Sequence, residues 1–282
     1  MRIPETNISR GQLIDMYAAC PLCGAQDIKV VLRAHQWSIY SCHVCTNAWT
    51  DPPPKEIDYS NENFHQSTMI DFERAALRTT ANLPPQWRHS LLLQADRLSA
   101  VLSPGARVLE IGCGEGLLLD ELARRGMRVV GIEPSETAST VARRKNLEVY
   151  TGYFPSTSIQ GSFDAVVMSH VLEHLPRPPE VLTAVDRILN GGCVMLVQTN
   201  WRGIMPHLRG RRWYAWVPDQ HFWHFTPRGL ATIFQPLGWS TQTVEYSSLV
   251  HPHVLRLCSD LASRLPGLGD QFQILAQTRT KY

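Results

Sequence analysis

The stretch VLEIGCGEGLLLDELARRG, from Val108 to Gly126, decides the fold of this chain. It begins with a short apolar run, Val108 to Ile111, which is typical of a buried parallel strand. A glycine-rich turn follows from Gly112 to Gly116, and Leu117 to Arg125 then has the apolar spacing of a helix. Strand, glycine turn and helix in this order predict a doubly wound α/β sheet, in which ligands bind beyond the carboxyl ends of the strands.

The next segment predicts a second strand and places a polar group at the same edge of the sheet. The segment MRVVGIEPS, residues 127–135, ends its apolar run at Glu133. A carboxylate at the end of the second strand is placed to accept hydrogen bonds from the hydroxyls of a ribose. The alternative is a helix N-terminal charge, which would only stabilise the following helix. The glycine turn and Glu133 together favour a nucleoside-binding site.

The glycine turn also indicates what kind of ligand binds. It reads E-x-G-x-G-x-G, with Glu110 two residues before Gly112, and so departs from the G-x-G-x-x-G pattern of dinucleotide-binding proteins. A carboxylate in the turn would repel a pyrophosphate. The turn therefore suits a cationic ligand.

Four stretches carry a resemblance to a known family: VLEIGCGEG, GIEPS, FDAVVMSHVLEHLPRP and ILNGGCVMLVQTN. Together, over roughly residues 102–281, they resemble the class I S-adenosylmethionine-dependent methyltransferases. The resemblance implies an α/β fold with a doubly wound, seven-stranded Rossmann-like methyltransferase sheet, S-adenosylmethionine as the cofactor and methyl transfer as the activity.

The same resemblance assigns cofactor-binding residues. It implies that Glu110 supports the methionine ammonium group through the turn, and that the cofactor passes close to the backbone of Gly112 and Gly114. Glu133 would hold the ribose hydroxyls. The further residues placed at the cofactor are Cys113, Gly116, Pro134, Gly152, Tyr153, Phe154, Ser169 and His170.

The rest of the chain predicts the remaining elements of this sheet. We expect strands at residues 163–168, 194–198, 240–248 and 272–279. We expect helices at residues 69–83, 85–102, 178–190 and 226–238. Gly191 and Gly192 would end the third of these helices, and Thr226 would cap the fourth.

Two cysteine pairs lie near the N-terminus: CPLCG contains Cys20 and Cys23, and CHVCT contains Cys42 and Cys45. The C-x2-C…C-x2-C spacing is typical of zinc sites, because each short pair can make a tight turn that directs two thiolates at one point. A module of this size buries too little core to fold well without its metal. We expect a structural Zn²⁺ with four cysteine ligands, and a pair of reduced dithiols without metal is the alternative.

The composition along the chain predicts its division. We expect a zinc ribbon over residues 1–55, with strands in IKVVLR and WSIYSC. Three consecutive prolines in TDPPPKEIDYSNENF indicate a linker, so linker and helical lead-in would occupy residues 56–101. The methyltransferase domain would occupy residues 102–282, with an aromatic lid segment at residues 201–225.

The segment WYAWVPDQHFWHF, residues 213–225, contains six aromatic side chains and two histidines. It follows the fifth predicted strand at the cofactor edge of the sheet, so we expect it to cover the methyl group and exclude water. His221 is the first candidate for a general base because an imidazole titrates near neutral pH, and His224 and His170 are the alternatives. In the other interpretation the rings form the core of a lid and the histidines are only satisfied polar groups.

The motif LEHL contains Glu173 and His174. It resembles ubiquinone-pathway O-methyltransferases, some of which use a divalent cation at this place. The alternative is that both side chains support the entry to the next helix.

Charge and hydropathy limit the partners. A formal net charge of +2 gives no general attraction to nucleic acid or anionic membrane, and LRGRRW at residues 208–213 is only a small basic patch. We see no apolar run that could span a membrane and no signal peptide, so we expect a cytoplasmic location and no membrane partner. The sequence does not indicate an oligomeric state.

The order of ribbon, linker and methyltransferase core resembles bacterial ribbon-bearing methyltransferases of saccharide and secondary-metabolite pathways. The resemblance implies a hydroxyl acceptor on a small molecule or glycan. One alternative is an RNA methyltransferase whose ribbon grips RNA, although residues 20–45 contain only Lys29 and Arg33 as basic side chains besides histidine. Another alternative is a protein that binds S-adenosylmethionine without catalysis.

Overall fold

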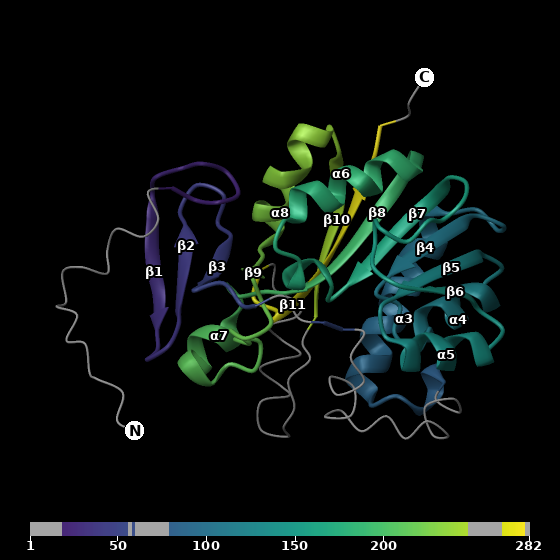
Figure 1. Cartoon of the computed structure of the whole chain (residues 1–282), viewed down its shortest axis with the longest axis horizontal. Helices are drawn as coiled ribbons and strands as arrows, with labels where there is room; N and C mark the ends of the chain where they lie inside the picture. The colour runs from purple at the N-terminus through teal and green to yellow at the C-terminus, as the bar shows by residue number, and fades with distance from the viewer. Residues whose placement is uncertain (1–18, 56–57, 60–78, 248–266, 280–282) are drawn as a thin grey trace.

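The structure is a computed structural model that describes residues 19–55, 58–59, 79–247 and 267–279. Its strands form a small and a large sheet (Figure 1). The small sheet consists, in spatial order, of β1 (Ile28–Arg33), β2 (Ser38–Cys42), β3 (Ala48–Asp51) and β9 (Trp223–His224). The large sheet consists of β10 (Ser240–Ser247), β11 (Gln271–Gln277), β8 (Leu189–Thr199), β7 (Phe163–Ser169), β4 (Arg107–Ile111), β5 (Arg128–Glu133) and β6 (Glu148–Thr151).

The large sheet confirms the predicted seven-stranded, doubly wound architecture. Strands β8, β7, β4, β5 and β6 are parallel, and β11 runs antiparallel between β8 and β10. The helices are α3 (Pro85–Val101), α4 (Leu117–Arg124), α5 (Glu136–Arg144), α6 (Pro178–Ile188), α7 (Ile204–Arg209) and α8 (Pro227–Phe234). Short 3-10 turns are η1 (Thr80–Asn82), η2 (Leu172–His174), η3 (Gly210–Arg212) and η4 (Gln235–Leu237).

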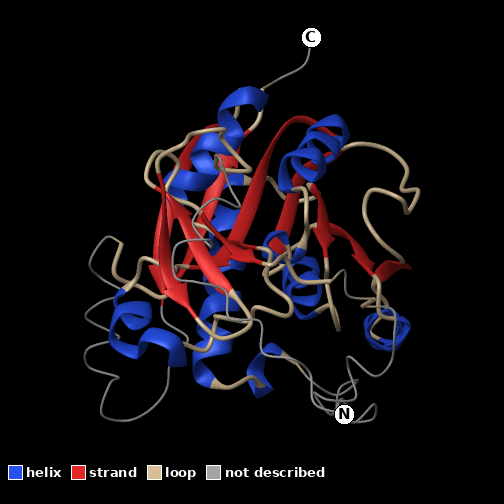
Figure 2. Cartoon of the chain, turned by 60° about the vertical axis from the view of Figure 1, so that its left-hand side comes forward, coloured by secondary structure: helices blue, strands red, loops and turns tan. Residues whose placement is uncertain are grey.

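Helices cover both faces of the large sheet (Figure 2). Side chains alternate along a strand, so one strand supplies both cores. In β7, Val166 and Met168 belong to the core that α6 and α8 complete, whereas Ala165 and Val167 pack with α3 and α4. A parallel sheet buried in this way has its ligand sites at the carboxyl ends of its strands.

The glycine pair after α6 does not end that helix, contrary to the prediction. The helix ends at Ile188, and Gly191 and Gly192 lie within β8, which starts five residues before the predicted Val194. A Cβ atom at position 192 would lie 2.2 Å from the carbonyl oxygen of Asp164. The pair therefore permits a close approach to β7, at a shift in strand register.

The two helices predicted before β4 differ in outcome. The prediction at residues 85–102 is confirmed by α3. Residues 69–78 of the other lie outside the described residues, and its end forms η1. Within the described part of the chain, no helix has the length and apolar character needed to cross a membrane.

The small sheet and the large sheet share a core. Tyr40 and Trp49 of the cysteine ribbon (residues 19–51) belong to the same buried cluster as Trp223 and Phe225. Strand β3, which the sequence did not predict, joins the ribbon to β9. The ribbon is thus packed on the rest of the chain through the segment at residues 213–225, here called the aromatic segment.

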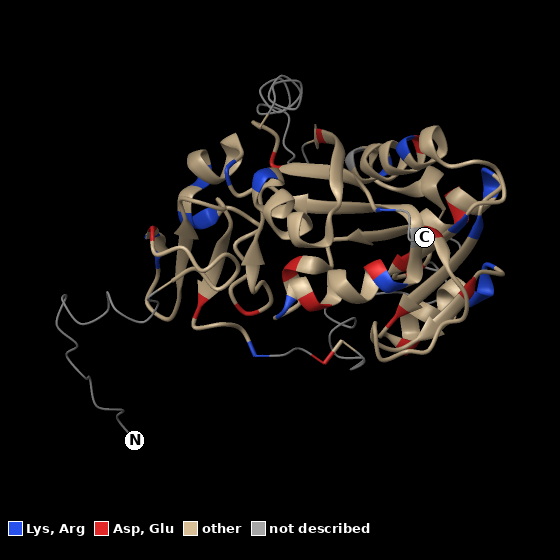
Figure 3. Cartoon of the chain, turned by 90° about the horizontal axis from the view of Figure 1, so that it is seen from above, with Lys and Arg blue, Asp and Glu red and all other residues tan. Residues whose placement is uncertain are grey.

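Charged side chains of both signs are interspersed over the helices (Figure 3). Arg209, Arg211 and Arg212 gather at the end of α7 and in η3. This small basic patch lies outside the β-strands of the cysteine ribbon.

Candidate active site

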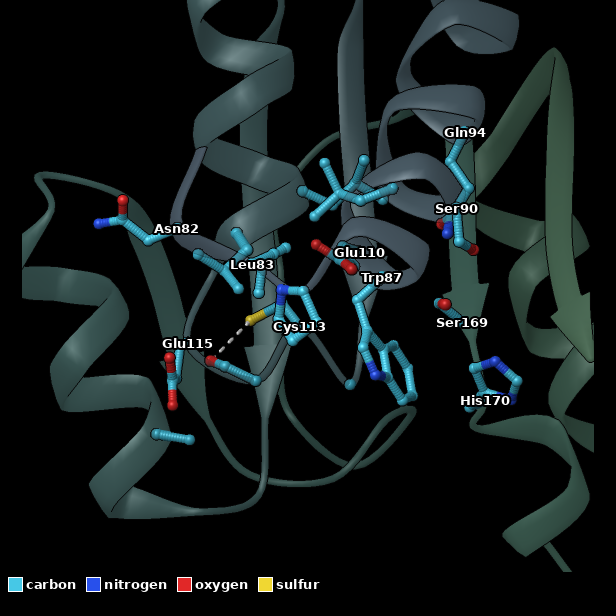
Figure 4. Close-up of a pocket in the computed structure, with 17 residues that line it drawn as sticks. Asn82, Leu83, Trp87, Ser90, Gln94, Glu110, Cys113, Glu115, Ser169 and His170 are labelled. Atoms are coloured by element: carbon cyan, nitrogen blue, oxygen red, sulfur yellow. Dashed lines mark hydrogen bonds between the residues drawn. The ribbon is translucent and has the colours of Figure 1, made fainter. Parts of the chain in front are cut away.

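A cavity of about 760 Å³ lies between α3 and the glycine turn (Figure 4). The turn side contributes Glu110, Gly112, Cys113, Gly114, Glu115, Leu117 and Leu118. The other walls are Asn82, Leu83, Pro84, Trp87, Ser90, Leu91, Gln94, Ala138, Ser169 and His170. We call it the first cavity.

A second cavity, of about 610 Å³, opens on the other side of the turn. Its lining includes Tyr59, Glu133, Gly152, Tyr153, Phe154, His174, Arg177 and Gln220. Gly112, Ser169 and His170 line both cavities, so the two cavities meet at the ends of β4 and β7. The structure therefore brings the predicted cofactor residues around one continuous space; Gly116 is the exception because it lines neither cavity.

The glycines of the turn adopt conformations that other residues rarely take. The φ angles of Gly112, Gly114 and Gly116 are 73°, 53° and 73°. A Cβ atom on Gly112 would also lie 2.5 Å from Val171. Gly116 instead begins α4 and packs against Leu147.

Glu133 connects the second strand to the turn. Its Oε2 accepts a hydrogen bond of 2.8 Å from the Gly114 amide, and its Oε1 accepts one of 2.9 Å from the Ser135 amide. A carboxylate has about four acceptor positions, so it keeps capacity for two more donors in the second cavity. Burial raises the pKa of Glu133 even though these amides favour its ionised form.

Several buried acceptor atoms in the wall of the first cavity have no donor among the described residues. They include Oε2 of Glu110 and Oε1 of Gln94. Burial, and then the charge of Glu133, raise the pKa of Glu110 well above its usual range. A ligand that carries an ammonium group would supply the missing donors and a compensating charge.

The sequence analysis missed the contribution of α3. Trp87, Leu91 and Gln94 recur at helical spacing and face the turn across the first cavity. Trp87 is 48% exposed, which is unusual for such a large ring, and it lies beside Glu110 and Cys113 in Figure 4. The spacing was visible in the sequence, but it could not reveal which element the helix faces.

His170 is held in a strained backbone conformation at the end of β7. Its φ angle is 54°, although it is not a glycine. Its Nδ1 lies 3.2 Å from Oε1 of Glu173, and its Nε2 lies 3.1 Å from Oε1 of Gln271. Burial opposes protonation of His170, but the hydrogen bond and charge of Glu173 outweigh it and raise the pKa. Burial also acts on Glu173, yet the same contact lowers its pKa to about 2.

His174 lines the second cavity, where the sequence analysis assigned it only a helix-entry or metal role. Its Nδ1 lies 2.8 Å from the Tyr59 hydroxyl and 3.3 Å from the Gln220 carbonyl oxygen. Burial lowers its pKa, so the imidazole is neutral at pH 7. The Tyr153 hydroxyl donates to Asp58 at 3.2 Å. The linker residues 58–59 thus close one side of this cavity.

The two histidines of the aromatic segment lie behind this wall. His221 is absent from the linings of both cavities, and its ring packs edge-on against His174 with 4.7 Å between centroids. Its Nδ1 lies 3.1 Å from the Ala215 carbonyl oxygen, and burial lowers its pKa to about 4. His224 is 1% exposed, and burial lowers its pKa well below the usual range.

Much of the aromatic segment packs on the cysteine ribbon. Trp213 and Trp216 lie in one cluster with Ile39 and Ala48 of the ribbon. The sequence led us to expect these rings above the methyl group. The apolar faces of β2 and β3 need a cover, and this segment supplies it.

The four ribbon cysteines fit a tetrahedral metal site. Their sulfur atoms lie within 4.8 Å of one another, with Sγ–Sγ distances of 3.7 Å for Cys20 and Cys45 and 3.6 Å for Cys23 and Cys42. A Zn–S distance of about 2.3 Å places tetrahedral sulfurs about 3.8 Å apart. The hydrogen bond with Cys45 lowers the pKa of the Cys20 thiol, and the same contact raises the pKa of Cys45. The geometry of the four sulfurs suits Zn²⁺.

A second group of potential ligand atoms lies beside the second cavity. Atoms of Glu173, His174 and His221 lie within 4.8 Å of one another. Glu173 already pairs with His170, and its other oxygen has no hydrogen-bond partner in the part of the chain that the structure describes.

The fold and the cavities define the class of this protein: it has the architecture of S-adenosylmethionine-dependent methyltransferases. A S-adenosylmethionine-dependent methyltransferase from Thermotoga maritima superposes with a TM-score of 0.55 at 19% identity, covering 77% of this chain and 99% of the other. Magnesium protoporphyrin IX methyltransferase from Synechocystis, with bound S-adenosylhomocysteine, gives 0.53 at 15% identity, with coverages of 77% and 97%. At such identities the likeness concerns the fold.

The family follows from the sequence match. The model of a methyltransferase domain family matches residues 82–244, and the chain belongs to this family. A ubiquinone biosynthesis O-methyltransferase from Xanthomonas axonopodis pv. citri is 36% identical over 152 residues, which is 49% of this chain and 63% of that protein. The protein of the same name from Hahella chejuensis is 35% identical over 134 residues, or 45% and 54% of the two chains. The chain thus matches less than two thirds of these relatives.

Proposed function

We propose that this chain transfers a methyl group from S-adenosylmethionine to a hydroxyl of a small-molecule acceptor, most readily a saccharide or secondary metabolite. One observation carries the proposal: two cavities meet at Gly112, Ser169 and His170, between Glu133 on one side and Glu110 on the other. A nucleoside with a cationic amino-acid tail matches this distribution of acceptors.

We assign the adenosine end of the cofactor to the second cavity and the methionine end to the first. Glu133 would accept hydrogen bonds from the ribose hydroxyls there. Glu110 and Gln94 would accept from the ammonium group. When bound, S-adenosylmethionine supplies an electrophilic methyl group on a sulfonium, which a nucleophile displaces in line. The task of the surrounding residues is to align the acceptor and exclude water.

The acceptor hydroxyl has to lose a proton, and we propose His221 as the base. Its low pKa keeps it neutral at pH 7, and a hydrogen bond from Nδ1–H to Ala215 leaves the lone pair on Nε2. His174 lies between His221 and the second cavity, and atoms of the two rings lie within 4.8 Å. We therefore place His174 on the path of the proton. His170 and His224 remain the alternatives to test.

The acceptor class rests on the second cavity and on the relatives. Tyr59, which is not among the residues assigned to the cofactor, offers an aromatic face that can stack on a sugar or on an aromatic ring. The relatives named for ubiquinone biosynthesis favour a phenolic hydroxyl as the runner-up within the small-molecule class. An RNA acceptor has less support, because the basic patch formed by Arg209, Arg211 and Arg212 is small and lies outside the ribbon strands.

Label transfer tests the proposal. The protein is incubated with methyl-labelled S-adenosylmethionine and, separately, with a sugar-rich small-molecule extract, a phenolic extract and total RNA, with and without a chelator. Label in a small glycan-like or secondary-metabolite product supports the proposal, and label in RNA overturns it. If none of them is labelled and calorimetry detects no cofactor binding, the proposed methyltransferase activity is contradicted. Cofactor binding without transfer to any supplied acceptor would favour the non-catalytic alternative.

A further inference from the structure

The cysteine ribbon is joined to the aromatic segment by paired strands. Ala48 and Trp49 of β3 pair with His224 and Trp223 of β9, so residues far apart in sequence form one sheet (Figure 1). The proposed base His221 lies only two residues before this pair. The ribbon therefore has a backbone connection to the segment that carries the base.

Thr50 adds two contacts beyond this pairing. Its backbone amide donates to the Phe222 carbonyl oxygen at 3.1 Å, and its hydroxyl donates to the His221 carbonyl oxygen at 2.7 Å. The same hydroxyl lies 3.2 Å from Nε2 of His224. Because the hydroxyl proton points to His221, the oxygen accepts from His224, which fixes the proton of that imidazole on Nε2. Nδ1 of His224 has no acceptor beside it among the described residues, so no hydrogen bond holds the proton on that nitrogen.

The second cysteine turn is fixed against α8. The hydroxyls of Thr46 and Thr226 lie 2.6 Å apart, and the Asn47 side-chain oxygen accepts from the Thr226 amide at 3.3 Å. A Cβ atom on Gly229 would lie 1.7 Å from that oxygen. Only glycine allows such an approach, so the second cysteine turn packs closely against the N-terminus of α8.

The aromatic segment in turn contacts Glu173 and, at the wall of the second cavity, His174. The amide of Phe222 donates to the carbonyl oxygen of Glu173 at 2.9 Å, while the His221 ring packs on His174. Glu173 in turn contacts His170, which lines both cavities. A continuous series of contacts thus runs from β3 to the meeting point of the cavities.

We infer that Thr50 is a positioning residue for His221. We also infer that the cysteine ribbon is a fixed support behind His221 and His174, and not a separate binding module. This inference rests on the proposed function only in the role that it gives His221. The positioning itself depends on the hydroxyl of Thr50 and can be measured without an acceptor.

The first test uses the zinc-loaded, unaltered protein. Long-range ¹H–¹⁵N NMR of the imidazole rings reports which nitrogen carries the proton. We expect His224 as the Nε2–H tautomer and His221 as the Nδ1–H tautomer at pH 7. A His224 ring protonated on Nδ1 would contradict the inference, whatever any variant does.

The second test compares variants by hydrogen exchange. Thr50→Val removes the hydroxyl, and Thr50→Ser keeps it. Thr278→Val is the matched control, because the Thr278 hydroxyl donates to the Gly192 carbonyl oxygen at the same 2.7 Å, with both partners outside the ribbon and the aromatic segment. Loss of one such hydrogen bond should speed local exchange about 5- to 10-fold. We expect this in peptides over residues 218–226 for Thr50→Val, with Thr50→Ser like the parent.

The outcomes separate this inference from the proposed function. Unchanged exchange in Thr50→Val, or equal acceleration over residues 218–226 in Thr278→Val, overturns the positioning role. Calorimetry with S-adenosylmethionine on the same proteins is independent of it, since no ribbon residue lines either cavity. Cofactor affinity should be equal in Thr50→Val and in the parent; a parent that does not bind the cofactor would remove the proposed function and leave the positioning result standing.

Discussion

Oε2 of Glu133 accepts a 2.8 Å hydrogen bond from the amide of Gly114, so the acid at the end of β5 holds the glycine turn that follows β4. The same carboxylate lines the second cavity. One side chain thus shapes the turn and faces the ligand.

Glu133→Ala should weaken S-adenosylmethionine binding by about 1–3 kcal/mol, because the ribose hydroxyls lose a buried acceptor. Isothermal calorimetry measures the change. Glu136→Ala is the matched control, since Glu136 is exposed in the first turn of α5 and should leave the affinity unchanged. Equal affinities of Glu133→Ala and the parent would contradict the proposed contact between Glu133 and the ribose.

Glu110→Gln should stabilise the ligand-free protein above pH 7. The folded-state pKa of Glu110 is raised, so the folded chain binds a proton more tightly than the unfolded chain does. The stability that this gives is present below the unfolded-state pKa of about 4.3 and is lost as pH rises toward the folded-state pKa. Thermal unfolding from pH 5 to pH 9 should show a smaller decline for Glu110→Gln. A steeper decline than that of the parent would contradict this account.

Gln94→Leu should weaken binding of S-adenosylmethionine but not of 5′-methylthioadenosine, which lacks the ammonium group. The Gln94 oxygen is, like Oε2 of Glu110, a buried acceptor in the first cavity that has no donor among the described residues. We expect a loss of about 5- to 10-fold, as for one hydrogen bond. Calorimetry with both ligands separates this from a general disturbance of α3, which would weaken both equally.

His221→Ala should lower turnover about 10²-fold or more once label transfer has provided an acceptor, while cofactor affinity is kept. His170→Ala and His224→Ala are compared under the same conditions. The variant with the largest fall in kcat at unchanged cofactor affinity identifies the base. Full activity of His221→Ala would limit the aromatic segment to structural and shielding roles.

Removal of zinc should loosen strands β3 and β9 before it loosens the strands that carry the glycine turn and Glu133. We expect one zinc per chain by elemental analysis, and Cys45→Ser should lower it. Chelation should speed hydrogen exchange in β3 and β9, because the cysteine turns and these strands pack together. Exchange in β4 and β5, which are interior strands of the large sheet, is the internal control. Equal loosening of all four strands would mean that the ribbon has no local role.

Local patterns were enough for the class of the large sheet and for the position of the glycine turn within it. The apolar run before Gly112, the turn itself and the acid at Glu133 each occupy the position that a parallel sheet gives them. These features depend on neighbours within a few residues, so period and spacing report them directly. The cysteine spacing is of the same kind, and the four sulfurs do converge.

Other parts of the site depend on contacts between distant segments. Nothing near Trp87 or Gln94 indicates that α3 faces the glycine turn, and nothing near Tyr59 indicates that it reaches His174. The role of Gly191 and Gly192 was missed for the same reason, because the close approach of β7 at Asp164 is a tertiary contact.

The sequence by itself determined the class of fold, the glycine turn, the acid at the end of the next strand and a cluster of four cysteines, because each is specified by local conformation and residue chemistry. Only the tertiary structure decided where the aromatic segment lies. Strand β9 pairs with the edge of β3, and Trp213 and Trp216 of the same aromatic segment cover the apolar side chains Ile39 and Ala48. That pairing set His224 against Thr50 and placed His221 behind His174, because burial of apolar surface and backbone pairing are properties of the whole chain.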